Sequence, residues 1–365
     1  MMVTQSLLSE LINVKSPCLH PWGYLWINAA GLVSFCPQNK SVLGSIHENS
    51  IAELWNNETA IHTRQLITEN RYEEAQCQRE CPYLRGKFTH PEESIPIPEL
   101  IFPDCNPSLI NAENVLQNLT LLTKSYRAYE YRVDHLPIVL DCQPILKCNA
   151  GCIMCGQPHD SDLKHDNVAW KRIAEVAPSL TAIRWQGGEV FLDNQFIDRV
   201  EEISRISHDQ LIKVIITNGS CLTNDMVDRI VKEASPVKFI ISIDGATKET
   251  VRSIRKNISI TNVFDCLSYL AKMRATHQSC DVIWNYTVMS KNVHEVEAAI
   301  LAAKRLVVDI NLAAIQGPYE ELNFFEYKLI DEQAIDSLIS RWEELANDKD
   351  VTVTGIDGLK SRLKN

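Results

Sequence analysis

From residue 136 onward, short runs of β-branched and aromatic residues alternate with stretches whose apolar residues recur every three or four positions. The first pattern is typical of buried strands and the second of helices that cover a sheet. The expected strands are 138–142, 182–186, 212–217, 237–243, 282–288 and 307–315. The expected helices between them are 170–176, 196–206, 224–234, 263–274 and 294–304. This βα alternation predicts an α/β fold with a parallel sheet, either doubly wound or a partial (β/α)6 TIM-like barrel.

Polar or glycine-rich turns follow the first four of these strands. Three cysteines follow the first strand, and residues 187–189 follow the second. Asn218-Gly219 follows the third strand, and Asp244-Gly245 follows the fourth. Because the carboxyl ends of parallel strands share one edge, where ligands bind, these turns predict a functional mouth.

Four parts are expected along the chain. A cysteine-rich module spans 1–90, and a connector with a helix at 111–129 spans 91–135; five prolines between 88 and 107 favour an extended connector. The barrel spans 136–320. An extension over 321–365 contains a helix at 331–347 and a short strand at 351–353.

Composition narrows the function classes. The 365 residues are 45% hydrophobic and carry a formal charge of -11, so the protein's field repels polyanions and we expect no nucleic-acid partner. No basic start with an apolar run and no stretch of about 20 apolar residues is present, so we expect no membrane partner and a cytoplasmic location.

The chain has twelve cysteines. A cytoplasmic compartment is reducing, which argues against a disulfide framework, so clustered cysteines indicate metal and scattered ones indicate core. The scattered cysteines, expected to be buried small apolar residues, are Cys105, Cys142, Cys221, Cys266 and Cys280.

Cys148, Cys152 and Cys155 have the spacing C-x3-C-x2-C with no fourth cysteine nearby. Three thiolates on a cubane cluster leave one of its four irons open to a ligand from outside the protein. A zinc site with His159 as fourth ligand, or three core cysteines, are the alternative interpretations.

Together with Gly187-Gly188-Glu189 and the run from Ser242 to Thr250, this triad resembles the radical S-adenosylmethionine (SAM) superfamily. The resemblance covers 137–318 and implies a partial (β/α)6 barrel that holds a 4Fe-4S cluster and SAM. It further implies that a reductant such as flavodoxin or ferredoxin supplies an electron, that SAM is cleaved to a 5′-deoxyadenosyl radical, and that this radical removes hydrogen from the substrate.

The resemblance also assigns cofactor-binding positions. Gly187 and Gly188 would let the backbone approach the methionine part of SAM, and Glu189 would lie near its ammonium group. Further SAM contacts would come from Thr217, Asn218, Ser242, Asn285, Ala313 and Ile153. Val190 and Ile153 depart from the proline and the aromatic residue that the family often has there. Arg252 and Arg255 are expected either near the mouth or on the surface.

A second set of four cysteines precedes the barrel. Cys18 and Cys36 are spaced C-x12-G-x4-C, and Cys77 and Cys81 are spaced C-x3-C. Four thiolates can complete an iron-sulfur cluster or a zinc site, and His20 and His47 are nearby alternative ligands.

The segments 18–22, 31–37, 43–46 and 50–56 resemble the SPASM and twitch modules, which bind auxiliary 4Fe-4S clusters. Such modules normally follow the barrel, whereas here the pattern precedes it. No cysteine follows Cys280, so one auxiliary cluster is expected rather than two. Its expected role is to relay electrons.

The resemblance therefore predicts an oxidoreductase that begins by hydrogen abstraction, with dehydrogenation, epimerisation or peptide modification as the outcome. With seventeen residues before Cys18, no leader-binding module is expected there, which favours a small molecule or a peptide or protein side chain as substrate. The catalytic acid or base is unassigned; Asp160, Asp244 and Glu320 lie on expected mouth loops. The alternative is a non-enzymatic iron-sulfur or zinc protein.

Overall fold

The computed structural model of the protein describes residues 18–78, 81, 112–327, 329–347 and 350–363. The expected proline-rich connector and Cys105 lie outside the described residues.

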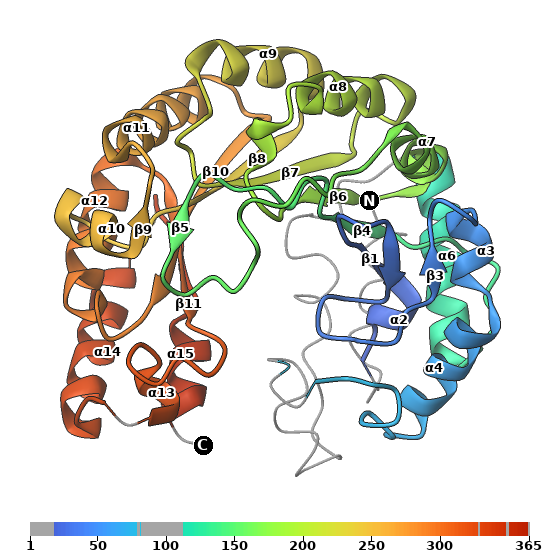
Figure 1. The fold of residues 1–365 in the computed structure, drawn as a ribbon, viewed down its shortest axis with the longest axis horizontal. Helices are drawn as coiled ribbons and strands as arrows, with labels where there is room; N and C mark the ends of the chain where they lie inside the picture. Colours follow the sequence, from blue (N-terminus) through green and yellow to red (C-terminus); the bar gives the residue numbers. More distant parts are fainter. Residues whose placement is uncertain (1–17, 79–80, 82–111, 328, 348–349, 364–365) are drawn as a thin grey trace.

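Six parallel strands form the barrel wall in the order in which the sequence predicts them (Figure 1). All six predicted strands are confirmed, with ends that differ by two residues or fewer. They are β4 (Val139–Cys142), β6 (Ala182–Trp185), β7 (Ile212–Thr217), β8 (Val237–Ser242), β10 (Cys280–Val288) and β11 (Asp309–Ala314). The short strand β12 (Val353–Thr354) pairs in parallel with β11.

Three N-terminal strands continue the same sheet past β4. The strand β1 (Tyr24–Ile27) pairs in parallel with β4, while β2 (Leu32–Ser34) and β3 (Gly44–Ser45) follow in antiparallel order. The result is a ten-stranded sheet, β12-β11-β10-β8-β7-β6-β4-β1-β2-β3. The Tyr24 hydroxyl donates a hydrogen bond to the Asp141 carboxylate across this junction. The cysteine-rich segment is therefore joined to the barrel by backbone pairing, an arrangement that the sequence pattern did not reveal.

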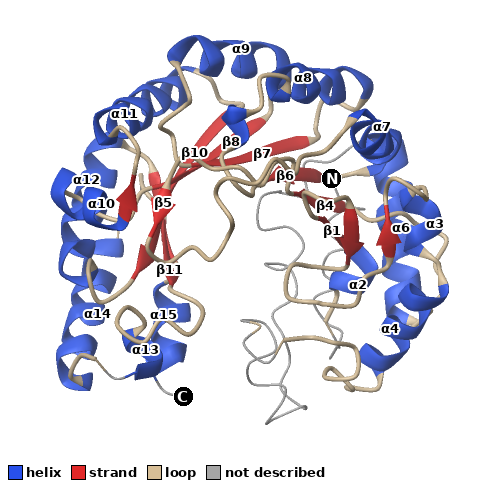
Figure 2. Cartoon of the chain, viewed as in Figure 1, coloured by secondary structure: helices blue, strands red, loops and turns tan. Residues whose placement is uncertain are grey.

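Helices cover the outside of this curved sheet (Figure 2). The predicted helices are present as α6 (Glu113–Arg127), α7 (Asn167–Val176), α8 (Phe196–Ile206), α9 (Asn224–Ala234), α11 (Ile260–Thr276), α12 (Val296–Leu306) and α14 (Glu332–Ala346). Side chains cap several of them; Asp166 accepts from the Ala169 amide at the start of α7, and Ser259 caps α11. Two further helices, α10 (Lys248–Ile254) and α15 (Ile356–Leu363), were not predicted.

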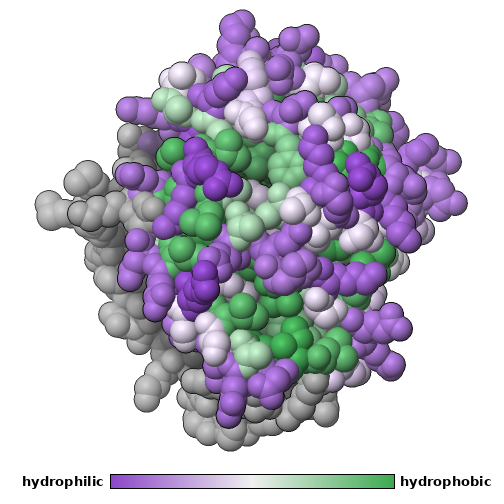
Figure 3. Space-filling view, turned by 90° about the vertical axis from the view of Figure 1, so that its left-hand side faces the viewer, coloured by the Kyte–Doolittle hydropathy of each residue, from purple (hydrophilic) through white to green (hydrophobic). Residues whose placement is uncertain are grey.

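The apolar core lies between the sheet and these helices. Trp185, Phe239 and Trp284 are fully buried there, and Trp284 meets the Phe264 ring of α11 edge to face. The face seen in Figure 3, on the side of α10, α11, α12 and α14, is hydrophilic toward its edge and has hydrophobic residues gathered in patches through its middle. Among the described residues, no helix has both the length and the apolar content that crossing a membrane requires.

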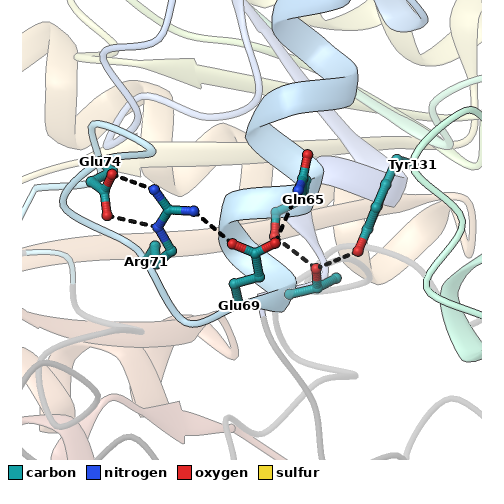
Figure 4. Close-up of polar contacts among 6 residues, drawn as sticks. Gln65, Glu69, Arg71, Glu74 and Tyr131 are labelled. Atoms are coloured by element: carbon teal, nitrogen blue, oxygen red, sulfur yellow. Dashed lines mark hydrogen bonds and ion pairs between the residues drawn. The ribbon is translucent and has the colours of Figure 1, made fainter.

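The N-terminal segment contributes three helices, α2 (His20–Gly23), α3 (Ile51–Trp55) and α4 (Glu58–Thr68). Ser50 and Glu53 form a capping box at the start of α3. Just after α4, the Arg71 guanidinium binds Glu74 through two nitrogens and Glu69 through a third (Figure 4). This network fixes the turn that leads toward Cys77.

Candidate functional site

The loop after β4, residues 143–165, carries the cysteine triad and is called the cluster loop here. Its short strand β5 (Gly151–Cys152) pairs with β9 (Arg255–Lys256), so that Cys152 lies opposite Arg255 (Figure 1). Cys148 and Cys152 are partly buried and Cys155 is exposed. Burial raises the pKa of the Cys148 thiol and raises that of Cys152 to about 11. Ile153 is partly buried against the apolar core.

The turn 187–189, the GGE turn, packs directly against the cluster loop. The Gly188 amide donates to the Ile145 carbonyl at 3.0 Å, and the Glu189 amide donates to the Lys147 carbonyl at 2.9 Å. A Cβ at position 188 would lie 1.9 Å from the Lys147 oxygen, which only glycine avoids. The two glycines thus allow the turn to pack closely against the backbone that precedes Cys148. This structural role is additional to the SAM contact that the resemblance implies.

The Glu189 carboxylate is fully buried and connects the ends of β6 and β7. It accepts hydrogen bonds from the Thr217 hydroxyl at 2.6 Å, the Asn218 amide at 2.8 Å and the Phe191 amide at 3.3 Å. Burial raises the pKa of this carboxyl, and the hydrogen bonds oppose that rise. The hydroxyl of Thr217 is therefore committed to Glu189.

Asn218 links this network to the cluster loop. Its side-chain nitrogen donates to Asn149 Oδ1 at 3.0 Å, and Asn149 Nδ2 donates to Ser220 Oγ at 2.8 Å and Cys221 Sγ at 3.3 Å. Asn149 was missed in the sequence; its place between two cysteines of the triad was the available signal.

The scattered cysteines divide into two groups. Cys142, Cys266 and Cys280 are buried, as predicted. The prediction was wrong for Cys221, which is only partly buried because it lies on the mouth loop beside Asn149.

A row of polar side chains crosses the other half of the sheet. Ser242 of β8 is in register with Asn285 of β10, Asn285 with Asn311 of β11, and Asn311 with Thr354 of β12. Asn311 Nδ2 donates to Asn285 Oδ1 at 2.8 Å, and the Thr354 hydroxyl donates to Asn311 Oδ1 at 3.0 Å. Ala313 lies two residues further along β11.

Among the predicted mouth charges, Arg255 and Asp244 are brought together. Their Nη2 and Oδ2 atoms are 2.8 Å apart and both side chains are buried. Arg252 is exposed, as are Asp160 and Glu320. Of the three acidic residues expected on mouth loops, Asp244 alone is buried, and it is occupied by the ion pair.

The four N-terminal cysteines line one cavity of about 380 Å³, called the junction cavity. Burial raises the pKa of Cys77 to about 11 and also raises the pKa values of Cys18 and Cys36. Asn39 Nδ2 lies 3.5 Å from Cys77 Sγ. His20 also lines the cavity, with its Nδ1 3.3 Å from Cys18 Sγ, whereas His47 pairs with Asp166.

Barrel residues line the same cavity from the side of β4 and β6. Asp141 is 1% exposed and accepts hydrogen bonds from Tyr24 and from Gln186 Nε2, the latter at 2.6 Å. Arg184 Nη1 lies 3.9 Å from Asp141 Oδ2. Sequence reasoning missed Asp141, although a carboxylate in an otherwise apolar strand was a usable signal.

Among the described residues, no three histidine, cysteine or acidic side chains converge closely enough to hold a single metal ion. A cubane cluster has four separate irons, so its thiolates surround a space rather than meet at a point. The donor set, cysteines lining a cavity, fits such a cluster.

The curved parallel sheet with three cysteines at its mouth is the arrangement that the resemblance implies for an iron-sulfur enzyme, and comparison with protein families specifies the domains. A model described as the radical SAM superfamily matches residues 143–301, and one described as an iron-sulfur cluster-binding domain, SPASM, matches residues 18–82. The chain thus contains a radical SAM domain over residues 143–301 and, ahead of it, a SPASM domain over residues 18–82.

The solved structures that match this chain are distant from it in sequence. SuiB of Streptococcus suis is 13% identical to this chain; the match covers 81% of this chain and 61% of SuiB, with a TM-score of 0.49. For SuiB bound to the precursor peptide SuiA, the match covers 94% of this chain and 73% of SuiB, with a TM-score of 0.47. The structure of anSMEcpe with bound AdoMet and the Cp18Cys peptide is 16% identical to this chain. The match covers 59% of this chain and 62% of the anSMEcpe chain, with a TM-score of 0.44. The chain spans less than two thirds of the anSMEcpe chains. No curated protein matches it.

Proposed function

We propose that this radical SAM enzyme abstracts hydrogen from a substrate in the barrel and uses a 4Fe-4S auxiliary cluster, held by Cys18, Cys36, Cys77 and Cys81, to relay an electron. One observation carries the proposal: those four cysteines and the buried barrel residue Asp141 line one cavity. A metal centre at the N-terminal cysteines would thus adjoin the barrel interior.

Cys148, Cys152 and Cys155 are the proposed ligands of the SAM-binding cluster. The bound cluster and SAM supply the hydrogen-abstracting radical. The chain's own part is positioning: the GGE turn fixes the backbone before Cys148, and Asn149 ties the cluster loop to the end of β7. Ser242 and Asn285 offer polar groups in register for SAM, while Ile153 and the backbone near Ala313 are the proposed adenine contacts.

The N-terminal thiols would lose their protons when metal binds, because burial keeps the metal-free thiols protonated near neutral pH. An iron-sulfur cluster is the proposed occupant because the family model that matches residues 18–82 is described as an iron-sulfur cluster-binding domain, and a zinc site is the alternative.

The proposed substrate is a small molecule or a peptide or protein side chain that reaches the junction cavity. Asp141 supplies a buried carboxylate in this wall, with Tyr24 and Gln186 as its donors. We assign to Asp141 the substrate-facing role that the sequence left open among Asp160, Asp244 and Glu320. A flavodoxin or ferredoxin is the proposed reductant.

The test is SAM cleavage by protein reconstituted with iron and sulfide without oxygen. After reduction and addition of SAM, the wild type should form 5′-deoxyadenosine and Cys152→Ala should not. A non-enzymatic scaffold predicts no product from the fully loaded wild type, and equal product from both proteins would also refute the proposal.

Iron content tests the auxiliary site separately. Cys36→Ala should lose about four irons per chain, the content of one cubane cluster. The matched control is Cys280→Ala, which removes a buried thiol far from both sets in the sequence and should retain the wild-type iron content. Equal iron in Cys36→Ala and wild type would contradict the auxiliary assignment.

A further inference from the structure

Arg255 stands out as a buried cation that touches one thiol of the triad. Its Nη1 donates to Cys152 Sγ at 3.6 Å, and its side chain is 9% exposed. The β5–β9 pairing brings the two residues together, since Cys152 and Arg255 are directly opposite in register and the Ile153 amide donates to the Ile254 carbonyl at 3.0 Å. Backbone geometry therefore fixes this contact.

Asp244 explains how the guanidinium tolerates burial. Its Oδ2 lies 2.8 Å from Arg255 Nη2, and its Oδ1 accepts from the Thr287 amide at 2.8 Å. A buried charge is costly unless it is paired, and Asp244 supplies the opposite charge. With one nitrogen held by the carboxylate, the planar guanidinium directs another toward the sulfur.

We propose that Arg255 is a positioning residue for Cys152 that raises the reduction potential of the SAM-binding cluster. The inference rests on the proposed function, because it requires Cys152 to be a cluster ligand. Hydrogen bonds to the sulfurs and the net charge nearby set cluster potentials, and a cation beside a thiolate stabilises the electron-rich reduced form. Removing this cation should make the cluster harder to reduce.

The experiment is an EPR-monitored redox titration of reconstituted, full-length protein. The relevant cluster is recognised because adding SAM changes its signal. In Arg255→Gln, its midpoint should become more negative, with at least a tenfold lower ratio of reduced to oxidised cluster at a fixed potential, equivalent to 59 mV for one electron. The auxiliary signal should not move.

Two further variants separate tuning from folding. Asp244→Asn combined with Arg255→Gln removes both charges, so no buried carboxylate is left unpaired; its midpoint should still become more negative than in the wild type, but by less than in Arg255→Gln, because a nearby negative charge is lost as well. Arg252→Gln, an exposed arginine of α10, should match the wild type.

An unchanged midpoint in iron-replete Arg255→Gln and in the double variant would overturn the proposal. Loss of iron from the triad in both variants would also overturn the proposal, because Arg255 would then be needed for cluster assembly and not for setting the reduction potential. A wild type that binds no SAM-responsive cluster would instead refute the proposed function itself.

Discussion

The Lys147 carbonyl oxygen fills the space beside Gly188 in which a side chain would begin. A Cβ at position 188 would be 1.9 Å from that oxygen and 2.5 Å from the Leu146 oxygen. Both atoms belong to backbone just before the first cysteine of the triad. The glycine is thus a measure of how tightly the GGE turn and the cluster loop are packed.

Gly188→Ala should push these two loops apart. We expect a loss of about 1–3 kcal/mol in the free energy of unfolding, the usual cost of overpacking, and weaker iron retention at the triad. Urea unfolding of the metal-free protein and iron analysis after reconstitution measure the two effects.

Gly358→Ala is the matched control, because an added Cβ there meets no atom within 4 Å. Gly358 lies inside α15, where alanine favours the helix by up to about 1 kcal/mol. Similar stabilities for the two variants would contradict the packing argument.

His165 should make stability depend on pH. It is buried, its Nε2 lies 2.9 Å from the Asn28 carbonyl oxygen, and burial lowers its pKa from 6.5 to about 4. Between these values, the unfolded chain binds a proton that the folded protein does not, so the stability contributed by the neutral ring is present above pH 6.5 and is lost as the pH falls toward 4.

Unfolding measurements from pH 7 to pH 4 test this dependence. The contribution of His165 is at most about 3 kcal/mol, at about 1.36 kcal/mol per pKa unit. His165→Gln keeps a donor for Asn28 but cannot ionise, so its stability should fall less steeply with acid. His62→Gln, on the exposed surface, should keep the wild-type slope; a wild-type slope in His165→Gln as well would refute the assignment.

Tyr24→Phe should weaken the junction between the SPASM segment and the barrel. It removes one hydrogen bond to the buried Asp141 carboxylate, and a bond to a charged group contributes about 1.5–3 kcal/mol. Unfolding by urea measures the loss. Tyr129→Phe alters an exposed tyrosine and should change the free energy of unfolding by less than about 0.5 kcal/mol. An equally small change in Tyr24→Phe would show that the hydrogen bond from Tyr24 to Asp141 does not stabilise the junction.

The alternation of strands and helices could be predicted from sequence because these elements have regular apolar periods, whereas the choice of a barrel over a doubly wound sheet came from the family resemblance. The SPASM segment could not be read in this way, since β2 and β3 have only three and two residues and carry no detectable period. The triad was found through its spacing, and the GGE turn through the family resemblance. The positions of Asn149 and Asp141 carried a local signal, but the contacts that these residues and Arg255 make depend on pairing between segments distant in sequence, which no local pattern encodes.

The pairing of β1 with β4 also sets an order of events during synthesis. Tyr24 and Asp141 are 117 positions apart, which corresponds to about 6–23 s of translation at about 5–20 residues per second. During that interval Cys18 and Cys36 have been made, but the barrel wall of their cavity has not. The cavity at the N-terminal cysteines therefore gains this wall only after β4, a strand that lies beyond them in the chain, has been made, so the four thiols exist for some time before their surroundings are complete.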